Sequence, residues 1–267
     1  MTDRRGGFYL KESDLELIRW LADYRYLQPS HLQKLSGRHI VSLRRRLRQL
    51  LAERLVDRLT LPLSRSRPID SPPDQYVYRL GSRGVKLARE ALGLDAVHTE
   101  DKKATFLEHD LAISAFHLGL ELMARESDGR VVLQWRQTGL QDWARDPDGQ
   151  RLSVNPDALF SFTDLRLPVD RNTNHFFLEV ERSRQHGYAN GESSFVRKVQ
   201  AYDAYSKQGR HRQTWGIDGF RVLVIVPTVE RAENQRIKVT NTGLEPGRFL
   251  FAEERLGPAG IADLLGI

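Results

Sequence analysis

Three carboxylates in the second half of this 267-residue chain have the types and spacing of a chemical site. Asp157 follows Pro156, and a single valine separates Glu179 from Glu181. Side chains two apart on a strand point to the same face of a sheet, so we expect Glu179 and Glu181 to share a face. Asp157 is expected to join them from the adjacent strand.

Carboxylates that gather at one point repel one another unless a cation or a proton relieves the charge. Clusters of oxygen ligands suit Mg2+ or Mn2+, and either ion can activate water and neutralise a phosphate during phosphodiester cleavage. If the site is active, the trio therefore forms the catalytic and metal-binding centre of a divalent-metal nuclease, with Lys198 stabilising charge. Two structural alternatives stay open: Glu181 pairs with Arg182 or Arg184, and Asp157 serves as a turn residue.

Other catalytic classes find no support in the sequence. Cysteine is absent, which excludes disulfides, zinc ribbons, iron-sulfur clusters and thiol catalysis. The Gly-x-Ser-x-Gly motif and a glycine-rich phosphate loop ending in Lys-Ser/Thr are absent as well. His109-Asp110 lacks the further motifs of an HD-type phosphohydrolase, and the histidines are too scattered for the metal cluster of a tyrosine relaxase.

Composition and charge indicate a globular protein with a basic front and a slightly acidic back. Hydrophobic residues make up 40% of the chain and charged residues 28%, and no apolar run approaches the roughly 18 residues that cross a bilayer. We therefore expect a cytoplasmic protein with no membrane partner. Residues 1–97 hold 19 Lys or Arg against 11 Asp or Glu, whereas residues 98–267 hold 22 against 24, which favours a polyanion-binding first domain.

The first domain shows the periodicity and punctuation of helices followed by a hairpin. Ser13 and Glu16 have the spacing of a capping box, and Ser36-Gly37 interrupts the second helix. The predicted helices cover residues 13–26, 29–35, 38–55 and 81–92, and the predicted strands cover residues 56–61 and 75–80. This arrangement predicts a winged helix-turn-helix over residues 1–97, followed by a linker over residues 93–103 that contains the domain boundary.

The third predicted helix is expected to enter the major groove of double-stranded DNA, since leucines line one face and arginines the others. Base-edge contacts are expected from residues predicted to be exposed: Ser42, Arg45 and Arg46. At the helix start, the candidates for base or phosphate contacts are Arg38 and His39. Phosphate contacts are expected from Arg44, Arg48, Arg65 and Arg67. In the alternative interpretation, the arginine run only solubilises a helix.

Residues 98–267 are expected to form an α/β domain. Predicted helices cover residues 104–126, 194–207 and 230–237, and predicted strands cover residues 131–136, 153–162, 176–181, 220–226 and 249–252. Along the chain, the elements from residue 104 to residue 226 follow the order helix, three strands, helix, strand. The predicted fold class is therefore α+β with two domains, and the second domain holds the three carboxylates.

This order of elements and these carboxylates resemble the PD-(D/E)xK nuclease-like fold. Pro156-Asp157 matches the PD pair of that family, and Glu179-Val180-Glu181 stands where the family has its acidic-x-Lys motif. The usual lysine is Glu181 in this chain, and Lys198 on the following helix is placed to take its role. Some members of the superfamily with Glu-x-Glu remain active and others keep only the scaffold. The resemblance therefore implies either a metal-dependent endonuclease that nicks DNA or an inactive nuclease scaffold.

As a whole, the chain resembles the bacterial replication-relaxation family, known from plasmids and other mobile elements. The matching segments lie in order within residues 10–230: Leu32–Leu35, Arg45–Leu50, Leu55-Val56, Tyr78–Gly81 with Gly84, His109–Leu111, and Glu179–Glu181 followed by Lys198 and Tyr202. The resemblance implies recognition of a DNA site during plasmid relaxation, replication or mobilisation. The implied partners are double-stranded DNA and a relaxase or replication protein, with a homodimer as a further option. The rival interpretation is a transcriptional regulator whose second domain dimerises or senses a ligand.

Overall fold

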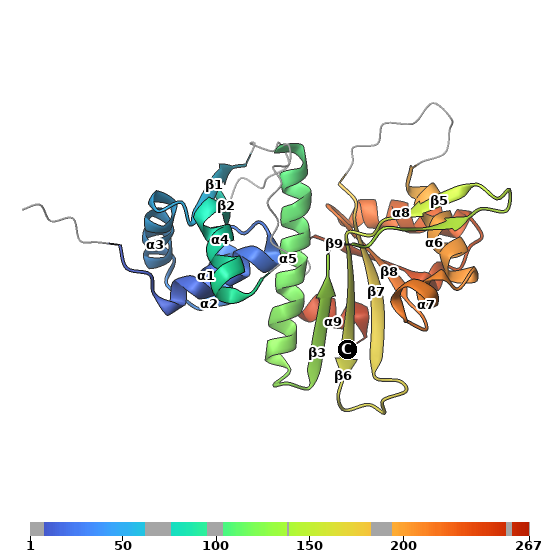
Figure 1. Ribbon diagram of the computed structural model, residues 1–267. Helices are drawn as coiled ribbons and strands as arrows, with labels where there is room; N and C mark the ends of the chain where they lie inside the picture. The colour runs from blue at the N-terminus through green and yellow to red at the C-terminus, as the bar shows by residue number, and fades with distance from the viewer. Residues whose placement is uncertain are drawn as a thin grey trace, which may run out of the picture. The chain divides into compact units, whose positions relative to one another are not determined.

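The computed structural model describes residues 8–61, 76–94, 104–137, 139–182, 194–254 and 258–266 (Figure 1). It is a mixed α+β structure, as predicted, in which N-terminal helices with a small hairpin precede a five-stranded mixed sheet with helices. The chain divides into two compact units, Met1–Leu118 and Gly119–Ile267. The assignment of separate domains to residues 1–97 and 98–267 stays a prediction. Within the described residues, no helix is long and apolar enough to cross a membrane.

The first unit is built from helices and a two-stranded hairpin. Its helices are α1 (Glu12–Tyr24), α2 (Pro29–Ser36), α3 (Ile40–Ala52), α4 (Ser82–Leu92) and the first part of α5 (Ala104–Glu126). Strands β1 (Val56–Thr60) and β2 (Tyr76–Leu80) pair antiparallel. The structure confirms each predicted element of this unit, with ends that differ by a few residues.

The start of α1 differs from the prediction because another carboxylate caps it. The helix begins at Glu12, so Ser13 lies within the first turn and does not precede it. The backbone N–H of Lys11 donates to Asp14 Oδ2 at 2.8 Å. The predicted pairing of Ser13 with Glu16 is therefore replaced by a contact of Asp14 with the residue before the helix.

The turn between α2 and α3 depends on a glycine. Gly37 has a φ of 66°, a left-handed conformation without steric penalty for glycine, and its N–H donates to Gln33 O at 2.8 Å. The chain then extends through Arg38 and His39, so α3 begins at Ile40 and not at the predicted Arg38. The fully buried residues of α3 are Leu43, Leu47 and Leu50, as its periodicity predicts.

α4 packs closely against the segment that joins α3 to β1. A Cβ on Gly84 would lie 2.0 Å from Leu55 O, and a Cβ on Gly81 would lie 2.5 Å from Arg54 O. The N–H of Gly81 donates to Leu55 O at 3.0 Å. These two glycines are therefore needed because a side chain would overlap the neighbouring backbone.

The first part of α5 completes the core of the first unit. One buried cluster joins this helix to the hairpin: Tyr26, Leu61, Val77, Leu107 and Leu111. Further along the helix, Ser114 Oγ donates to Tyr24 O at 2.9 Å, and the ring of His117 stacks on Tyr24 with centroids 4.3 Å apart. Burial lowers the pKa of His117 to about 3, so this imidazole is a neutral part of the core.

The second unit contains a mixed sheet with the strand order β3-β6-β7-β8-β9. Its strands are β3 (Val131–Arg136), β6 (Ala158–Asp164), β7 (Thr173–Val180), β8 (Arg221–Val226) and β9 (Phe249–Glu253). β3, β6 and β7 pair antiparallel, whereas β7, β8 and β9 pair parallel. The remaining elements are the second part of α5, hairpin strands β4 (Asp142–Arg145) and β5 (Arg151–Val154), helices α6 (Ser194–Lys207), α7 (Arg210–Trp215), α8 (Val229–Asn241) and α9 (Pro258–Leu265), and the short helix η1 (Pro246–Arg248).

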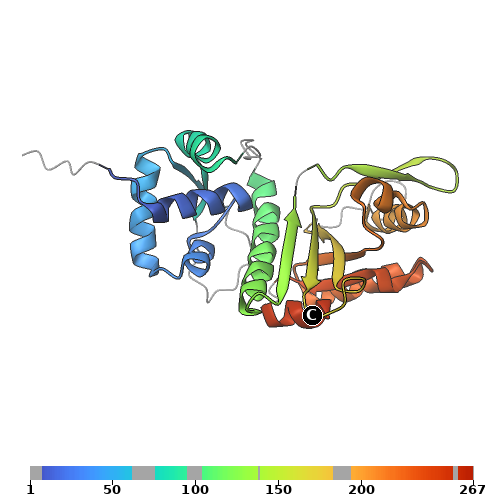
Figure 2. The same cartoon turned by 60° about the horizontal axis from the view of Figure 1, so that its bottom comes forward.

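One face of this sheet packs against α6. Phe177 of β7 and Val224 of β8 share a buried cluster with Tyr202 and Tyr205, which lie on α6. The β4–β5 hairpin lies beside α6 and contributes Leu152 to the same cluster (Figures 1 and 2). α6 is therefore held between the main sheet and the hairpin, which fixes the direction of its side chains.

Two expectations for the second unit are corrected. The predicted strand over residues 153–162 is two strands in different sheets, β5 and β6, because Asn155-Pro156-Asp157 interrupts the extended strand between them. Proline lacks the N–H that a continuous strand would use. The predicted strand over residues 176–181 ends at Val180, so Glu181 lies just beyond β7. β4, α7, η1 and α9 were not predicted.

Candidate functional site

Glu179 lies at the centre of a polar cluster between β7 and α6. It is 4% exposed. Lys198 Nζ donates to Glu179 Oε2 at 2.5 Å, and the Tyr202 hydroxyl donates to Oε1 at 2.6 Å. Lys198 and Tyr202 stand four residues apart on α6, so one helix face presents both donors. The structure thus brings two of the predicted catalytic residues, Glu179 and Lys198, into direct contact.

Asp157 lies next to this cluster, in the connection between β5 and β6. Its N–H donates to Leu178 O at 2.9 Å, and its Oδ2 accepts the N–H of Val180 at 2.7 Å. These backbone groups flank Glu179 on β7, and the charge of Asp157 acts on both Glu179 and Lys198. Asp157 therefore joins the cluster as expected, although it comes from a connection and not from a strand.

Glu181 lies at the edge of the same cluster. Its N–H donates to Ile225 O at 2.8 Å, and its Oε1 lies 3.7 Å from a guanidinium nitrogen of Arg231 on α8. Arg182 forms its ion pair with Glu254. Glu181 and Arg182 thus each have a partner on another element, and a pair between the two stays a prediction. Arg184 lies outside the described residues.

Burial is the largest influence on the ionisable groups of this cluster. It raises the pKa of Glu179, and Asp157 adds to the rise while Lys198 and Tyr202 oppose it. Burial lowers the pKa of Lys198, but Glu179 and the other carboxylates outweigh burial, so this pKa lies above its ordinary value. Burial beside Glu179 raises the pKa of Tyr202 well above 10.0. Near neutral pH, Lys198 is therefore an ammonium and Tyr202 a neutral phenol.

The arrangement of these side chains does not fit a divalent metal ion. Across the described ranges, no group of three or more His, Cys, Asp or Glu side chains is placed to hold one. Lys198 already donates to Glu179 Oε2, and Asp157 Oδ2 already accepts a backbone N–H. Metal binding by Asp157, Glu179 and Glu181 stays a prediction, and it requires these groups to rearrange.

A cleft of about 360 Å³ opens beside the cluster. Its lining comes from β5, the connection to β6, β7 and α6: Arg151, Leu152, Ser153, Asn155, Glu179, Arg197, Lys198, Ala201 and Tyr202. Three of these side chains are cationic and one is a buried carboxylate. The net positive lining favours an anionic group in the cleft.

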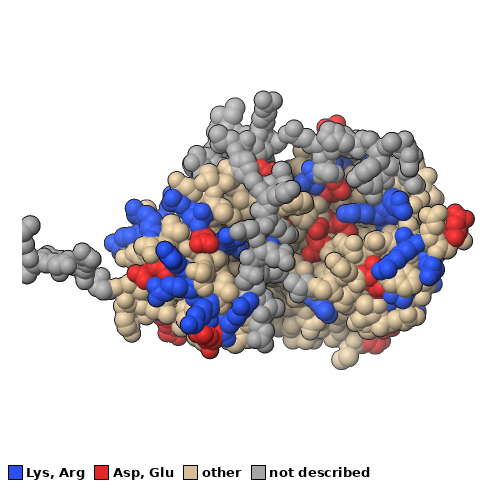
Figure 3. Space-filling view, turned by 45° about the horizontal axis from the view of Figure 1, so that its top comes forward, with Lys and Arg blue, Asp and Glu red and all other residues tan. Residues whose placement is uncertain are grey.

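The outer face of α3 carries most of the predicted DNA contacts of this helix. Its exposed residues are Val41, Ser42, Arg44, Arg45, Arg48, Gln49 and Ala52. Val41, Arg45 and Arg48 stand at positions i, i+4 and i+7 and so lie on one face. Figure 3 shows Lys and Arg side chains gathered over this unit. His39 is exposed just before the helix.

The sequence interpretation did not include Val41 among the exposed residues of this helix face. This side chain is 63% exposed, although it is apolar. Its position beside Ser42 in a basic helix was the available signal, because an apolar side chain in the major groove can contact a thymine methyl group.

Arg46 does not share the exposure predicted for it. Its side chain is 15% exposed and donates through Nε to Asp14 Oδ1 at 2.8 Å and through Nη2 to Tyr9 O at 2.7 Å. Its guanidinium also lies 4.8 Å from the centre of the Phe8 ring. The prediction of exposure is wrong because Asp14, on a neighbouring helix, binds this guanidinium. Whether Arg46 also reaches DNA stays a prediction.

The remaining DNA-binding candidates are placed differently. Arg38 is partly buried, and its Nη2 donates to Ser13 O at 3.1 Å, so part of its hydrogen-bonding capacity serves the fold. Arg65 and Arg67 lie outside the described residues.

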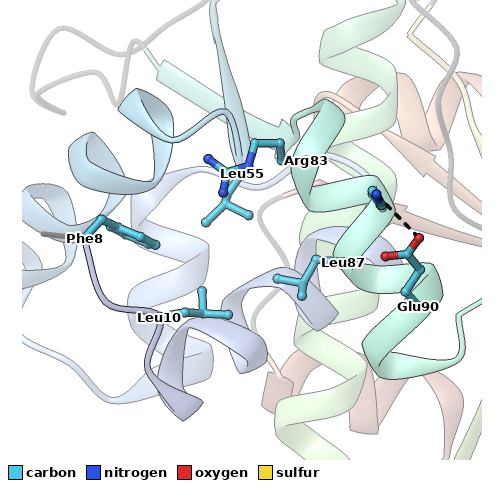
Figure 4. A pocket seen from close by; sticks show the side chains of 7 residues that line it. Phe8, Leu10, Leu55, Arg83, Leu87 and Glu90 are labelled. Carbon is cyan, nitrogen blue, oxygen red and sulfur yellow. Dashed lines mark ion pairs between the residues drawn. The ribbon is translucent and has the colours of Figure 1, made fainter.

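A second pocket, of about 420 Å³, lies in the first unit (Figure 4). Phe8, Leu10, Leu55 and Leu87 line its apolar part, with Arg83 and the ion pair of Lys86 and Glu90 beside them. None of the predicted site residues lines it.

The β4–β5 hairpin brings together residues that the sequence interpretation missed. Asp142 is buried and accepts hydrogen bonds from Tyr205 OH at 2.8 Å, Thr214 Oγ1 at 2.6 Å and Arg210 Nη2 at 2.5 Å. Burial raises the pKa of Asp142, but these donors lower it below its ordinary value. The signal in the sequence was the turn Asp146-Pro-Asp-Gly149 between two short alternating runs.

These features define a class of protein: a mixed α+β chain with a basic helix in its first unit and a lysine-bridged carboxylate cluster in its second. The sequence model of the Replication-relaxation family matches residues 18–219, and the chain belongs to that family. No curated protein and no solved structure matches the chain.

Proposed function

We propose that this protein binds a site on double-stranded DNA of a plasmid or related mobile element and acts there in replication, relaxation or mobilisation. Membership of the Replication-relaxation family supports the biological role. The observation that carries DNA binding is the outer face of α3, where Val41, Arg45 and Arg48 are exposed opposite the buried leucines of the helix. Guanidinium groups on such a face offer paired donors to guanine and charge to phosphates.

The proposed fold of the first unit is a winged helix-turn-helix. α2, the left-handed Gly37 and α3 follow one another as helix, tight turn and helix. The antiparallel β1–β2 hairpin follows α3, as the wing does in this class of domain. In this arrangement α3 is the recognition helix, and His39 at its start lies near the phosphate backbone.

The proposed fold of the second unit is a PD-(D/E)xK nuclease-like core. In chain order α5, β3, β6, β7, α6 and β8 give helix, three strands, helix and strand, interrupted by the added hairpin and α7. Asp157 precedes β6, Glu179 lies on β7 and Lys198 lies on α6. Lys198 donates to Glu179, and the described residues hold no group of carboxylates placed for a metal, which supports a proposed role in which this unit engages DNA or a relaxase or replication partner without cutting.

The binding proposal is tested with duplex fragments that tile the genetic element encoding the protein. Fluorescence anisotropy first finds the fragment bound with highest affinity. The Arg45→Ala, Arg48→Ala double variant is expected to lose at least about 10-fold in affinity for it, because two charge-assisted contacts disappear. Arg89→Ala, which removes one exposed arginine from α4, is the control for loss of positive charge elsewhere on the unit and is expected to bind normally.

Unchanged affinity of the double variant would overturn the assignment of α3 as the recognition helix. Binding confined to promoter fragments, with no effect on supercoiling or plasmid transfer, would instead favour the transcriptional regulator.

The non-cutting role is tested by incubating the protein with supercoiled DNA of the same element in EDTA, Mg2+ or Mn2+. We expect binding without nicking under all three conditions. Metal-dependent nicking that is lost in an Asp157→Ala, Glu179→Ala variant would show that the cluster rearranges around a metal, and it would make the protein a nuclease.

A further inference from the structure

The β4–β5 hairpin has one buried and one outward face. Its residues alternate, so that Asp142, Ala144, Leu152 and Val154 are buried. The outward side chains are Trp143, Arg145, Arg151 and Ser153, and Arg145 lies opposite Arg151 in the antiparallel register. The hairpin therefore presents one aromatic ring and two guanidinium groups on the side away from α6.

Three guanidinium groups surround the Trp143 ring. Their central carbons lie 5.2 Å from the ring centroid for Arg145, 5.2 Å for Arg151 and 4.3 Å for Arg210 of α7. Such distances correspond to cation–π contacts. The contacts hold the ring and the charges together as one surface.

This surface continues into the cleft beside Glu179. Arg151 contacts Trp143 and also lines the cleft, where Arg197 and Lys198 of α6 follow. We define the basic strip as Trp143 with Arg145, Arg151, Arg197, Lys198 and Arg210. It combines side chains of the hairpin, α6 and α7, all within the second unit. Figure 3 shows Lys and Arg side chains over this unit as well.

Three arginines of the strip differ from many others in their unit in having no carboxylate partner within the described ranges. Many arginines elsewhere in the unit are paired with carboxylates: Arg125, Arg166, Arg182, Arg212, Arg231, Arg236 and Arg248. Arg145, Arg151 and Arg197, by contrast, form no ion pair with a carboxylate among the residues that the structure describes. Their charge is available to an external anion.

Two cations of the strip, Arg210 and Lys198, are held in place by buried carboxylates. Asp142 holds Arg210 while also accepting from Tyr205 and Thr214, and Glu179 holds Lys198. Anchoring reduces the side-chain entropy that would otherwise be lost on binding. The strip is thus built as a pre-organised surface.

We infer that the basic strip binds single-stranded DNA, with phosphates on its arginines and a base stacked at Trp143, where the base displaces the guanidinium group of Arg145 or Arg151 from the ring. Alternating cations and an aromatic ring suit a single strand, because its unpaired bases expose faces that can stack. A duplex hides those faces between neighbouring base pairs. The choice of DNA rests on the proposed function, in which α3 holds the duplex site and the strip takes a strand that is opened or displaced there.

The test uses the full-length chain and fluorescence anisotropy with a labelled thymidine oligonucleotide, which forms no duplex. Trp143→Ala and the Arg151→Ala, Arg197→Ala double variant are each expected to lose about 10-fold or more in affinity, since one stacked base or two phosphate contacts disappear. Trp143→Phe retains an aromatic face and is expected to recover most of the binding. The Arg166→Ala, Arg236→Ala double variant removes two ion-paired arginines of the same unit and serves as the charge-matched control.

The outcomes separate this inference from the proposed function. The Arg45→Ala, Arg48→Ala variant is expected to lose duplex binding and to keep binding of the thymidine oligonucleotide. The strip variants are expected to keep duplex binding and to lose binding of the oligonucleotide. If the α3 variant keeps duplex binding while the strip variants lose thymidine binding, the proposed role of α3 fails and the strip stands. If the Trp143→Ala variant and the arginine double variant bind the thymidine oligonucleotide as tightly as wild type, the inferred role of the strip is wrong. It is also wrong if the protein binds a uridine RNA oligonucleotide more tightly than the thymidine DNA oligonucleotide. Thermal melting of each variant verifies that it is folded.

Discussion

The ion pair of Arg46 with Asp14 links α3 to α1 through a fully buried carboxylate. Arg46 also donates to Gln49 Oε1 at 2.8 Å and to Tyr9 O at 2.7 Å. Neighbouring arginines of the same run are exposed. One residue of the arginine run therefore serves the fold, whereas Arg45 and Arg48 extend into solvent.

Replacing Arg46 with alanine is expected to lower the free energy of unfolding by about 3 kcal/mol, because the Asp14 carboxylate stays buried without its partner. Arg45→Ala makes the same chemical change at an exposed position and is expected to stay within about 0.5 kcal/mol of wild type. Urea unfolding followed by circular dichroism measures both values. Equal losses in the two variants would contradict the structural role of Arg46.

The same pair makes stability depend on pH in the acid range. Burial raises the pKa of Asp14, but the hydrogen bonds from Arg46 and from the Lys11 N–H lower it more, so it lies below the ordinary value of 3.8. The stabilisation is therefore complete above pH 3.8 and is lost as the pH falls through the lower pKa of the folded state. We expect the difference in unfolding free energy between wild type and Arg46→Ala to shrink below that pH. A difference that stays constant down to strong acid would argue against an ionised Asp14.

Lys198 has the corresponding role at Glu179, with the opposite dependence on pH. Lys198→Met is expected to cost about 2 kcal/mol at neutral pH, because Glu179 keeps its burial and loses its cation. The pKa of Glu179 is raised in the fold, and the substitution raises it further, so the variant loses stability as the pH rises from 4.5 through that pKa. Urea unfolding at several pH values should show the deficit growing toward neutrality. Adding Glu179→Gln to the variant should remove most of this growth.

Among the secondary-structure elements, α4 shows how a helix depends on the absence of a side chain. Gly84→Ala is expected to cost about 3 kcal/mol or more, since the new Cβ would lie 2.0 Å from Leu55 O and the backbones must separate. Gly93→Ala, at the end of the same helix, has open space and only a left-handed φ of 64°, so about 1 kcal/mol is expected. Thermal melting ranks the two. A smaller loss at Gly84 than at Gly93 would show that α4 can shift at little cost.

The hairpin of β4 and β5 shows how a short element gains a defined position. Two four-residue strands are only marginally stable alone. Asp142 fastens them to α6 and α7 through Tyr205, Thr214 and Arg210. The outward face of the hairpin is therefore held in a constant orientation relative to the cleft.

Considered as a whole, the protein has exposed arginines on both units, and the proposed DNA affinity should depend on them. The logarithm of the duplex affinity is expected to fall linearly with the logarithm of salt concentration, with a slope of about −0.9 for each phosphate neutralised. The Arg45→Ala, Arg48→Ala variant should lower the magnitude of that slope by about 1 to 2, whereas Arg89→Ala should leave it unchanged. Titrations at several salt concentrations measure the slopes. Equal slopes in all three proteins would place the phosphate contacts elsewhere.

Local signals along the chain were sufficient to predict most elements. The leucines at 43, 47 and 50 predicted the buried face of α3, and Pro29 with Gly37 marked the ends of α2. The order of the short motifs, from Leu32–Leu35 to Glu179–Glu181, predicted the family that the comparison shows. Such signals depend on neighbours within a few residues, where helix and strand periodicity operates.

The sequence by itself therefore determined the α+β class, the positions of most helices and strands, and the family. Only the tertiary structure decided which charges meet. Asp14 binds Arg46, which is 32 residues away, and Tyr205 reaches Asp142 across 63 residues. It also decided that Pro156 separates two strands of different sheets, which creates the hairpin and its outward arginines. Contacts of this kind depend on how the folded chain brings distant segments together, and no local periodicity encodes that arrangement.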